Sequence, residues 1–121
     1  MARSQMVVLV VEDEPLVRMG IVDYLEDQGF TVLEACGADE AVDLLVSNPT
    51  IQLLFTDIDM PGGMDGLKLA AAVRKRWPPV KIVVTSGHRR VEVGDLPVEA
   101  KFLPKPYNPD TVAAMLRAFD A

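Results

Sequence analysis

The sequence predicts an α/β fold in which a doubly wound, five-stranded parallel sheet carries helices on both faces. Two observations predict it. Short apolar runs of strand length alternate about five times with segments of helical periodicity. Two of these runs, Met6–Val11 and Leu53–Phe55, contain no polar residue, which is typical of strands buried on both faces of a parallel sheet. Right-handed crossovers between such strands place helices on both sides.

Length and composition fit a single domain over residues 1–121, with 50% hydrophobic and 25% charged residues. The net charge of -6 argues against nucleic acid as a direct partner. Cys36 is the only cysteine, which excludes an internal disulfide and a cysteine-built metal site and suits a reducing compartment. No run resembles a signal peptide or is long enough to cross a membrane, so we expect a cytoplasmic protein.

The first strand and helix are predicted from Met6–Val11 and from the segment between Pro15 and Gly29. Met6–Val11 is rich in β-branched residues and predicts a central strand. Pro15 suits the first turn of a helix, and Gly29 suits its C-terminal stop. The apolar residues that recur at helical spacing between them are Leu16, Val17, Met19, Ile21, Val22 and Leu25.

The middle of the chain repeats this alternation. Phe30–Ala35 predicts a short second strand, and Asp39–Val46 predicts a second helix that ends before Pro49. Leu53–Asp57 predicts the third strand, and Leu67–Trp77 predicts the third helix.

The last part predicts a fourth strand over Lys81–Thr85 and a fifth around Phe102–Leu103, followed by a helix capped by Asn108. Between these two strands, Gly94 and Pro97 argue against a regular helix. We therefore expect a reduced or irregular fourth helix.

Carboxylates follow two of the predicted strands. In the flavodoxin-like strand order 2-1-3-4-5, the commonest at this size, strands 1 and 3 are neighbours, so Glu12 and Asp13 lie beside Asp57. Carboxylates at such close range repel one another, and the usual remedy is a hard divalent cation such as Mg²⁺. Asp13 and Asp57 are the best direct ligands, Glu12 would act through a water, and the main-chain carbonyl of Asp59 could complete the set. The alternative is that these acidic loops only decorate the strand ends.

Two further polar residues reach the same edge. Lys105 follows the fifth strand and could pair with Asp57 or with an anion carried on it. Ser86 follows the fourth strand and could donate its hydroxyl to the same anion. Taken alone, each would be an ordinary surface or turn residue.

These motifs together resemble the receiver domain of two-component response regulators. The resemblance covers nearly the whole chain and rests on Glu12-Asp13, Asp57, Met60-Pro61, Asp65-Gly66, Ser86-Gly87 and Lys105-Pro106, in that order after successive strands. It implies a phosphoacceptor signalling domain rather than an enzyme, which catalyses only its own phosphoryl transfer and slow dephosphorylation.

The resemblance also implies roles for individual residues. Asp57 would accept a phosphoryl group from a histidine kinase or a histidine phosphotransfer protein of a bacterial phosphorelay. Mg²⁺ would be held by Asp13 and Asp57 with help from Glu12, while Lys105 and Ser86 would contact the phosphoryl group. Phe102 occupies the aromatic switch position, three residues before the lysine. We expect either a stand-alone receiver or one excised from a hybrid sensor kinase.

One departure and two alternatives accompany this resemblance. The loop Met60–Gly66 is one residue longer than the common form, which should move the loop without disabling Asp57. A haloacid dehalogenase-type phosphatase would also carry an Asp-x-Asp pair such as Asp57-Ile58-Asp59, but on the first strand and followed by Gly-Thr. A pseudo-receiver that binds partners without phosphorylation should lack an acidic residue or the lysine, and this chain lacks none of them.

Overall fold

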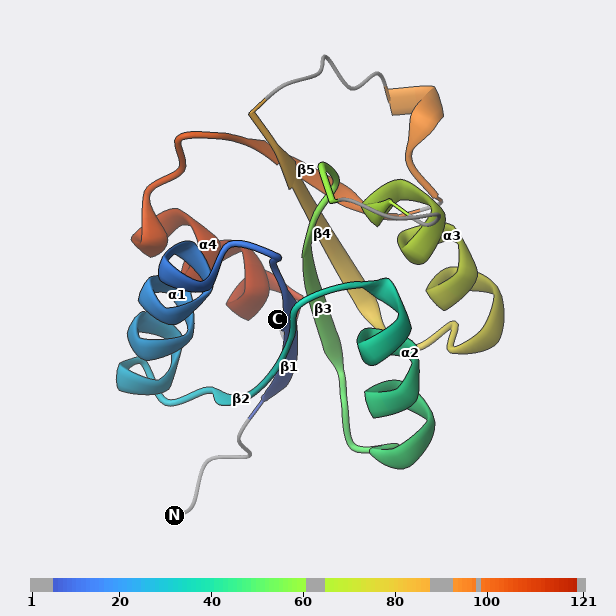
Figure 1. The fold of residues 1–121 in the computed structure, drawn as a ribbon, viewed down its shortest axis with the longest axis horizontal. Helices are drawn as coiled ribbons and strands as arrows, with labels where there is room; N and C mark the ends of the chain where they lie inside the picture. Colours follow the sequence, from blue (N-terminus) through green and yellow to red (C-terminus); the bar gives the residue numbers. More distant parts are fainter. Residues whose placement is uncertain (1–5, 61–64, 88–92, 98, 120–121) are drawn as a thin grey trace.

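A computed structural model of the chain describes residues 6–60, 65–87, 93–97 and 99–119 (Figure 1). Its elements, in order, are β1 (Val7–Val11), α1 (Pro15–Asp27), β2 (Thr31–Ala35), α2 (Ala38–Ser47), β3 (Leu53–Asp57), α3 (Gly66–Arg76), β4 (Lys81–Ser86), a 3-10 turn (Val93–Asp95), β5 (Lys101–Pro104) and α4 (Pro109–Ala118).

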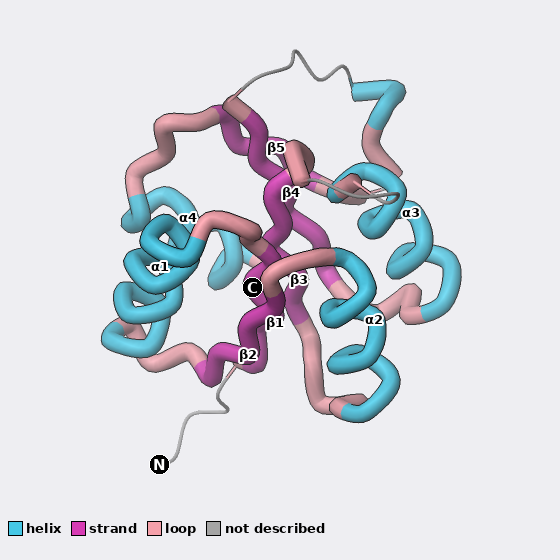
Figure 2. The backbone as a smooth tube through the Cα atoms, in the orientation of Figure 1, coloured by secondary structure: helices cyan, strands magenta, loops and turns pink. Residues whose placement is uncertain are grey.

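The strands form one parallel sheet in the order β2-β1-β3-β4-β5, which confirms the predicted topology. Helices α1 and α4 cover one face and α2 and α3 cover the other (Figures 1 and 2). Because all strands are parallel, their carboxyl ends meet at one edge of the sheet.

Side chains of the central strands alternate between two cores. Val8, Val10 and Phe55 pack beneath α1 and α4, whereas Leu9 and Leu54 pack beneath α2 and α3. Both faces of β1 and β3 are therefore buried, which explains their unbroken apolar runs. Each fully buried side chain of this size stabilises the fold by about 1.5–3 kcal/mol relative to exposure. These cores hold the strand ends, and the residues that follow them, in a fixed register.

Local signals set the helix starts. Pro15 and Pro109 occupy the first turns of α1 and α4. Asp65 caps α3 by accepting a hydrogen bond from the Lys68 N–H at 2.9 Å, and Asn108 caps α4 by accepting one from the Asp110 N–H at 2.9 Å. The predicted cap at Asn108 is thus confirmed, whereas the cap at Asp65 was not predicted.

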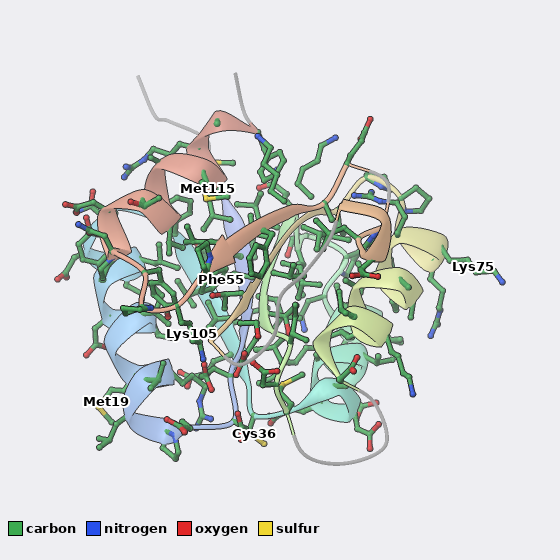
Figure 3. The ribbon with its side chains drawn as sticks, turned by 90° about the horizontal axis from the view of Figure 1, so that it is seen from above. Met19, Cys36, Phe55, Lys75, Lys105 and Met115 are labelled. Atoms are coloured by element: carbon green, nitrogen blue, oxygen red, sulfur yellow. The ribbon has the colours of Figure 1, made fainter. Side chains whose placement is uncertain are left out.

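Helix α1 departs from its simple apolar periodicity. Ile21, Val22 and Leu25 are buried, but Leu16 and Met19 are 82% and 56% exposed. Figure 3 shows Met19 on the outer side of this helix. Apolar periodicity identifies the face of a helix that can be buried. It does not show which turns of the helix extend past the edge of the sheet. Leu16 is the second residue of α1.

Between β4 and β5, the described residues contain one short 3-10 turn, Val93–Asp95, and no α-helix. This agrees with the expected irregular segment. Glu99 has a φ of 66°, a left-handed conformation that a regular helix does not contain. Leu96 and Ala100 are partly buried against the core beneath α2 and α3. Residues 88–92 and 98 of this segment, and Pro61–Met64 of the lengthened loop, lie outside the described residues.

Candidate functional site

The carboxyl edge of the sheet gathers three acidic side chains. Glu12 and Asp13 follow β1, and Asp57 is the last residue of β3, which pairs with β1. One carboxylate oxygen from each of the three lies within 4.8 Å of the others. The predicted convergence of the two acidic loops is therefore present in the structure.

Asp57 is held through both of its carboxylate oxygens. The Asp59 N–H donates to Oδ1 at 3.1 Å, and the Lys105 Nζ lies 3.2 Å from Oδ2. The residue is only 4% exposed. These two contacts fix the orientation of the Asp57 carboxylate next to the carboxylates of Glu12 and Asp13.

Lys105 joins two of the three carboxylates. Its Nζ donates to Glu12 Oε1 at 3.2 Å, the same distance that separates it from Asp57. The sequence predicted the contact with Asp57 but not the one with Glu12. In Figure 3, Lys105 lies between α1 and the central strands. A single ammonium group therefore faces a crowded set of anions and only partly compensates their charge.

Burial and crowding shift the acid–base behaviour of these groups. Burial raises the pKa of Asp57 above its ordinary value, against the opposing effects of the Asp59 N–H and Lys105. Burial also raises the pKa of Glu12, and the nearby charge of Asp57 adds to the rise. Burial lowers the pKa of Lys105, but the two carboxylates outweigh this effect, so its pKa is raised and it stays protonated. The cluster thus favours an added positive charge.

Ser86, at the end of β4, has a partner that the sequence did not reveal. Its hydroxyl donates to Asp59 Oδ2 at 2.5 Å, and the residue is 2% exposed. The sequence predicts a role only for the main-chain carbonyl of Asp59, whereas in the structure its carboxylate also accepts a hydrogen bond from Ser86. The only sequence feature that could have indicated this contact is the acidic residue two positions after Asp57.

Phe102, the expected switch residue, lies within β5 and is half-buried. Its ring packs against the core beneath α2 and α3, where Leu96 and Ala100 also pack. It is therefore connected to the irregular segment before β5. It does not lie on the α1 side of the sheet, where Leu103 packs.

An open groove of about 680 Å³ adjoins the acidic cluster on the α1 side. Its apolar lining comes from the start of α1 and from the loop between β5 and α4, and includes Leu16, Val17, Pro106, Tyr107 and Pro109. Lys105 lines the same groove, so the groove and the cluster share one residue. The Tyr107 ring stands edge-on to Phe55, with ring centroids 5.5 Å apart.

The family model for the response regulator receiver domain matches residues 8–117. The chain belongs to this family. As a receiver domain it is a regulatory signalling module of two-component systems, and the resemblance predicted from its motifs is confirmed. Its Asp57 ends the third strand rather than the first, which contradicts the haloacid dehalogenase alternative.

Named relatives agree with the family. The chain is 37% identical over 114 residues to the sensor kinase CckA of Brucella abortus, covering 91% of the chain but only 12% of that relative. The receiver domain solved from the hybrid histidine kinase CckA is 33% identical, with a TM-score of 0.79 and 93% and 96% of the two chains covered. A response regulator receiver protein from Pseudomonas putida is 30% identical, with a TM-score of 0.85 and coverage of 97% and 99%.

No helix within the described residues is long and apolar enough to cross a membrane.

Proposed function

We propose that Asp57 accepts a phosphoryl group from a phosphohistidine of a histidine kinase or phosphotransfer protein. The observation that carries this proposal is the setting of Asp57: a nearly buried carboxylate, fixed by the Asp59 N–H and Lys105, beside the carboxylates of Glu12 and Asp13. A structural ion pair would need the lysine but not two further acidic groups at the same point. The family supports the proposal, because receiver domains act in two-component signalling.

In the proposed reaction, a carboxylate oxygen of Asp57 attacks the phosphorus of the phosphohistidine. The phosphorus–nitrogen bond breaks, its electron pair stays on the imidazole, and that nitrogen takes up a proton. The product is an acyl phosphate on Asp57. Lys105, which already lies 3.2 Å from Oδ2, can follow the negative charge onto the transferred group.

The donor set fits Mg²⁺. Three carboxylates provide hard oxygen ligands within 4.8 Å of one another, and the ammonium group of Lys105 contacts two of them, those of Glu12 and Asp57. Mg²⁺ would neutralise charge on the phosphoryl oxygens during transfer. Asp13, Asp57 and the Asp59 carbonyl would hold it directly. Both carboxylate oxygens of Glu12 already accept hydrogen bonds, from Lys105 and from the Glu14 N–H, which supports an indirect role through water.

The groove on the α1 side supports a protein as the phosphodonor. Its lining is mostly apolar, it is shared with Lys105, and the exposed side chain of Leu16 lies along it. We propose that the protein carrying the phosphohistidine covers this groove while its imidazole approaches Asp57. Loss of the groove's apolar side chains should therefore slow transfer from a protein donor more than transfer from acetyl phosphate.

Labelling with acetyl phosphate tests the proposal directly. The wild-type chain should acquire one phosphoryl group on a Phos-tag gel in the presence of Mg²⁺, and EDTA or Asp57→Asn should abolish the shifted band. An unlabelled wild-type chain would instead favour a pseudo-receiver that binds partners without phosphorylation. Undiminished labelling of Asp57→Asn would show that another residue is the acceptor.

A further inference from the structure

Arg18 fastens helix α1 to the ends of two strands. Its Nη1 donates to the main-chain carbonyl of Glu12 at 2.8 Å, and its Nε donates to Glu34 Oε1, on β2, at 3.0 Å. The side chain is only 20% exposed. None of the reaction steps proposed above uses this residue.

The contact with Glu12 bears on both acidic residues after β1. The Glu12 carbonyl belongs to the same planar peptide group as the Asp13 N–H, so a hydrogen bond that fixes this carbonyl also fixes the backbone entering Asp13. The Glu12 N–H is held separately, by the Ala35 carbonyl at 3.1 Å. The Glu12 N–H is thus bonded to β2, and the Glu12 carbonyl is bonded to Arg18.

We propose that Arg18 is a positioning residue for the Mg²⁺ site. By holding the peptide group between Glu12 and Asp13, its guanidinium keeps both carboxylates directed toward Asp57. Groups that orient metal ligands from outside the coordination sphere commonly affect metal affinity by 10-fold or more. This inference rests on the proposed function, because it assumes that the acidic cluster binds Mg²⁺.

The sign of the effect separates positioning from simple electrostatics. Arg18 carries a positive charge next to the main chain of Glu12, and this charge by itself disfavours a cation bound nearby. If charge alone mattered, removing Arg18 would strengthen Mg²⁺ binding. If positioning dominates, removing Arg18 weakens binding, and a lysine, which keeps the charge but lacks the planar fork of donors, does not restore it.

Mg²⁺ titrations followed by amide chemical shifts test the inference on four chains: wild type, Arg18→Gln, Arg18→Lys and Glu34→Gln. We expect both Arg18 variants to bind Mg²⁺ about 10-fold more weakly than wild type. Glu34→Gln removes the exposed ion pair but leaves the carbonyl contact, so its affinity should stay close to wild type. The Asp13 amide should also shift in both Arg18 variants without Mg²⁺. Thermal melting establishes whether each variant is folded. If Arg18→Gln does not fold, the comparison of Arg18→Lys with wild type tests the inference.

The outcomes distinguish this inference from the function on which it rests. Wild-type Mg²⁺ binding together with equal or tighter binding by the Arg18 variants would overturn the positioning role alone. Weakening by Glu34→Gln as large as by Arg18→Gln would also overturn it, because the ion pair rather than the carbonyl contact would then matter. A wild-type chain that binds no Mg²⁺ would overturn the metal site and this inference together.

Discussion

The Ser86 hydroxyl donates a hydrogen bond to the Asp59 carboxylate at 2.5 Å. The hydroxyl that we expect to follow a phosphoryl group on Asp57 is thus held by a neighbouring carboxylate. Hydrogen bonds to an ionised acceptor are about twice as strong as neutral ones. A response of Ser86 to phosphorylation therefore requires this bond to be exchanged for one to the phosphoryl group.

We predict that Ser86→Ala and Asp59→Asn alter the conformational response in opposite directions. In Ser86→Ala, the rate of labelling by acetyl phosphate should stay within about threefold of the wild-type rate, which corresponds to less than about 1.4 kcal/mol in the activation free energy. The amide shifts that phosphorylation causes in β4 and β5 should be smaller than in wild type. Asp59→Asn weakens the competing acceptor, so the amide shifts of the beryllofluoride-bound protein should be larger or appear at lower beryllofluoride concentration. Amide shifts in Ser86→Ala that match wild type would remove Ser86 from the switch.

Thr85, the neighbour of Ser86 in β4, offers a matched control with its own predicted outcome. Its side chain is buried, and its hydroxyl has no hydrogen-bond partner among the described residues. An unsatisfied buried hydroxyl costs about 1–3 kcal/mol. Thr85→Val, which is nearly the same size, should raise the free energy of unfolding by about 1 kcal/mol in urea melts. It should leave the switch response unchanged; a loss of stability would show that the hydroxyl has an unseen partner.

The convergence of Asp13, Asp57 and Lys105 could be predicted because parallel strand ends share one edge, so the order of strands alone determines which side chains meet. The Ser86–Asp59 bond could not, because side-chain directions in a loop depend on local backbone angles that residue types do not specify. Arg18 was missed for a related reason: it lies one turn before the buried Ile21 and Val22 of α1, and an arginine at that position carries no sequence signal that it reaches a strand end. The exposure of Leu16 depends on where α1 passes the sheet, which periodicity does not encode.

Gly66 begins α3 where no side chain fits, so we predict that Gly66→Ala is destabilising. A Cβ at this position would lie 2.1 Å from the Asp57 carbonyl oxygen and 2.7 Å from Ile58 Cα. Both atoms belong to the backbone, so α3 or the end of β3 must shift. We expect a loss of about 1–3 kcal/mol in the free energy of unfolding, with slower labelling of the displaced Asp57.

Gly20→Ala is the matched control for this loss. Gly20 lies inside α1, and a Cβ there would meet no atom within 4 Å. In a helix interior, alanine is favoured over glycine by about 0.5–1 kcal/mol, so this variant should be slightly more stable than wild type. Equal stability of Gly66→Ala and Gly20→Ala in urea melts would show that α3 can move away from Asp57 at no cost.

Finally, we predict that Asp57→Asn stabilises the metal-free protein at neutral pH. Burial raises the pKa of Asp57 in the folded state above its ordinary value of 3.8. A group whose folded-state pKa is raised contributes stability that is fully present below the unfolded pKa and is lost as pH rises through the folded pKa. At pH 7 the ionised carboxylate therefore costs stability, and asparagine, which stays neutral, removes that cost.

Thermal melts with EDTA, at a series of pH values, measure this effect. The melting temperature of Asp57→Asn should exceed that of wild type at pH 7, and the difference should shrink as pH falls toward about 4. Adding Mg²⁺ should raise the melting temperature of wild type more than that of the variant, because a ligand stabilises only the state that binds it. A variant that melts below wild type at pH 7 in EDTA would mean that the attraction between Lys105 and Asp57 outweighs the cost of burying the carboxylate. The acidic cluster would then be stable without a cation, and the physical argument for a metal site would fail.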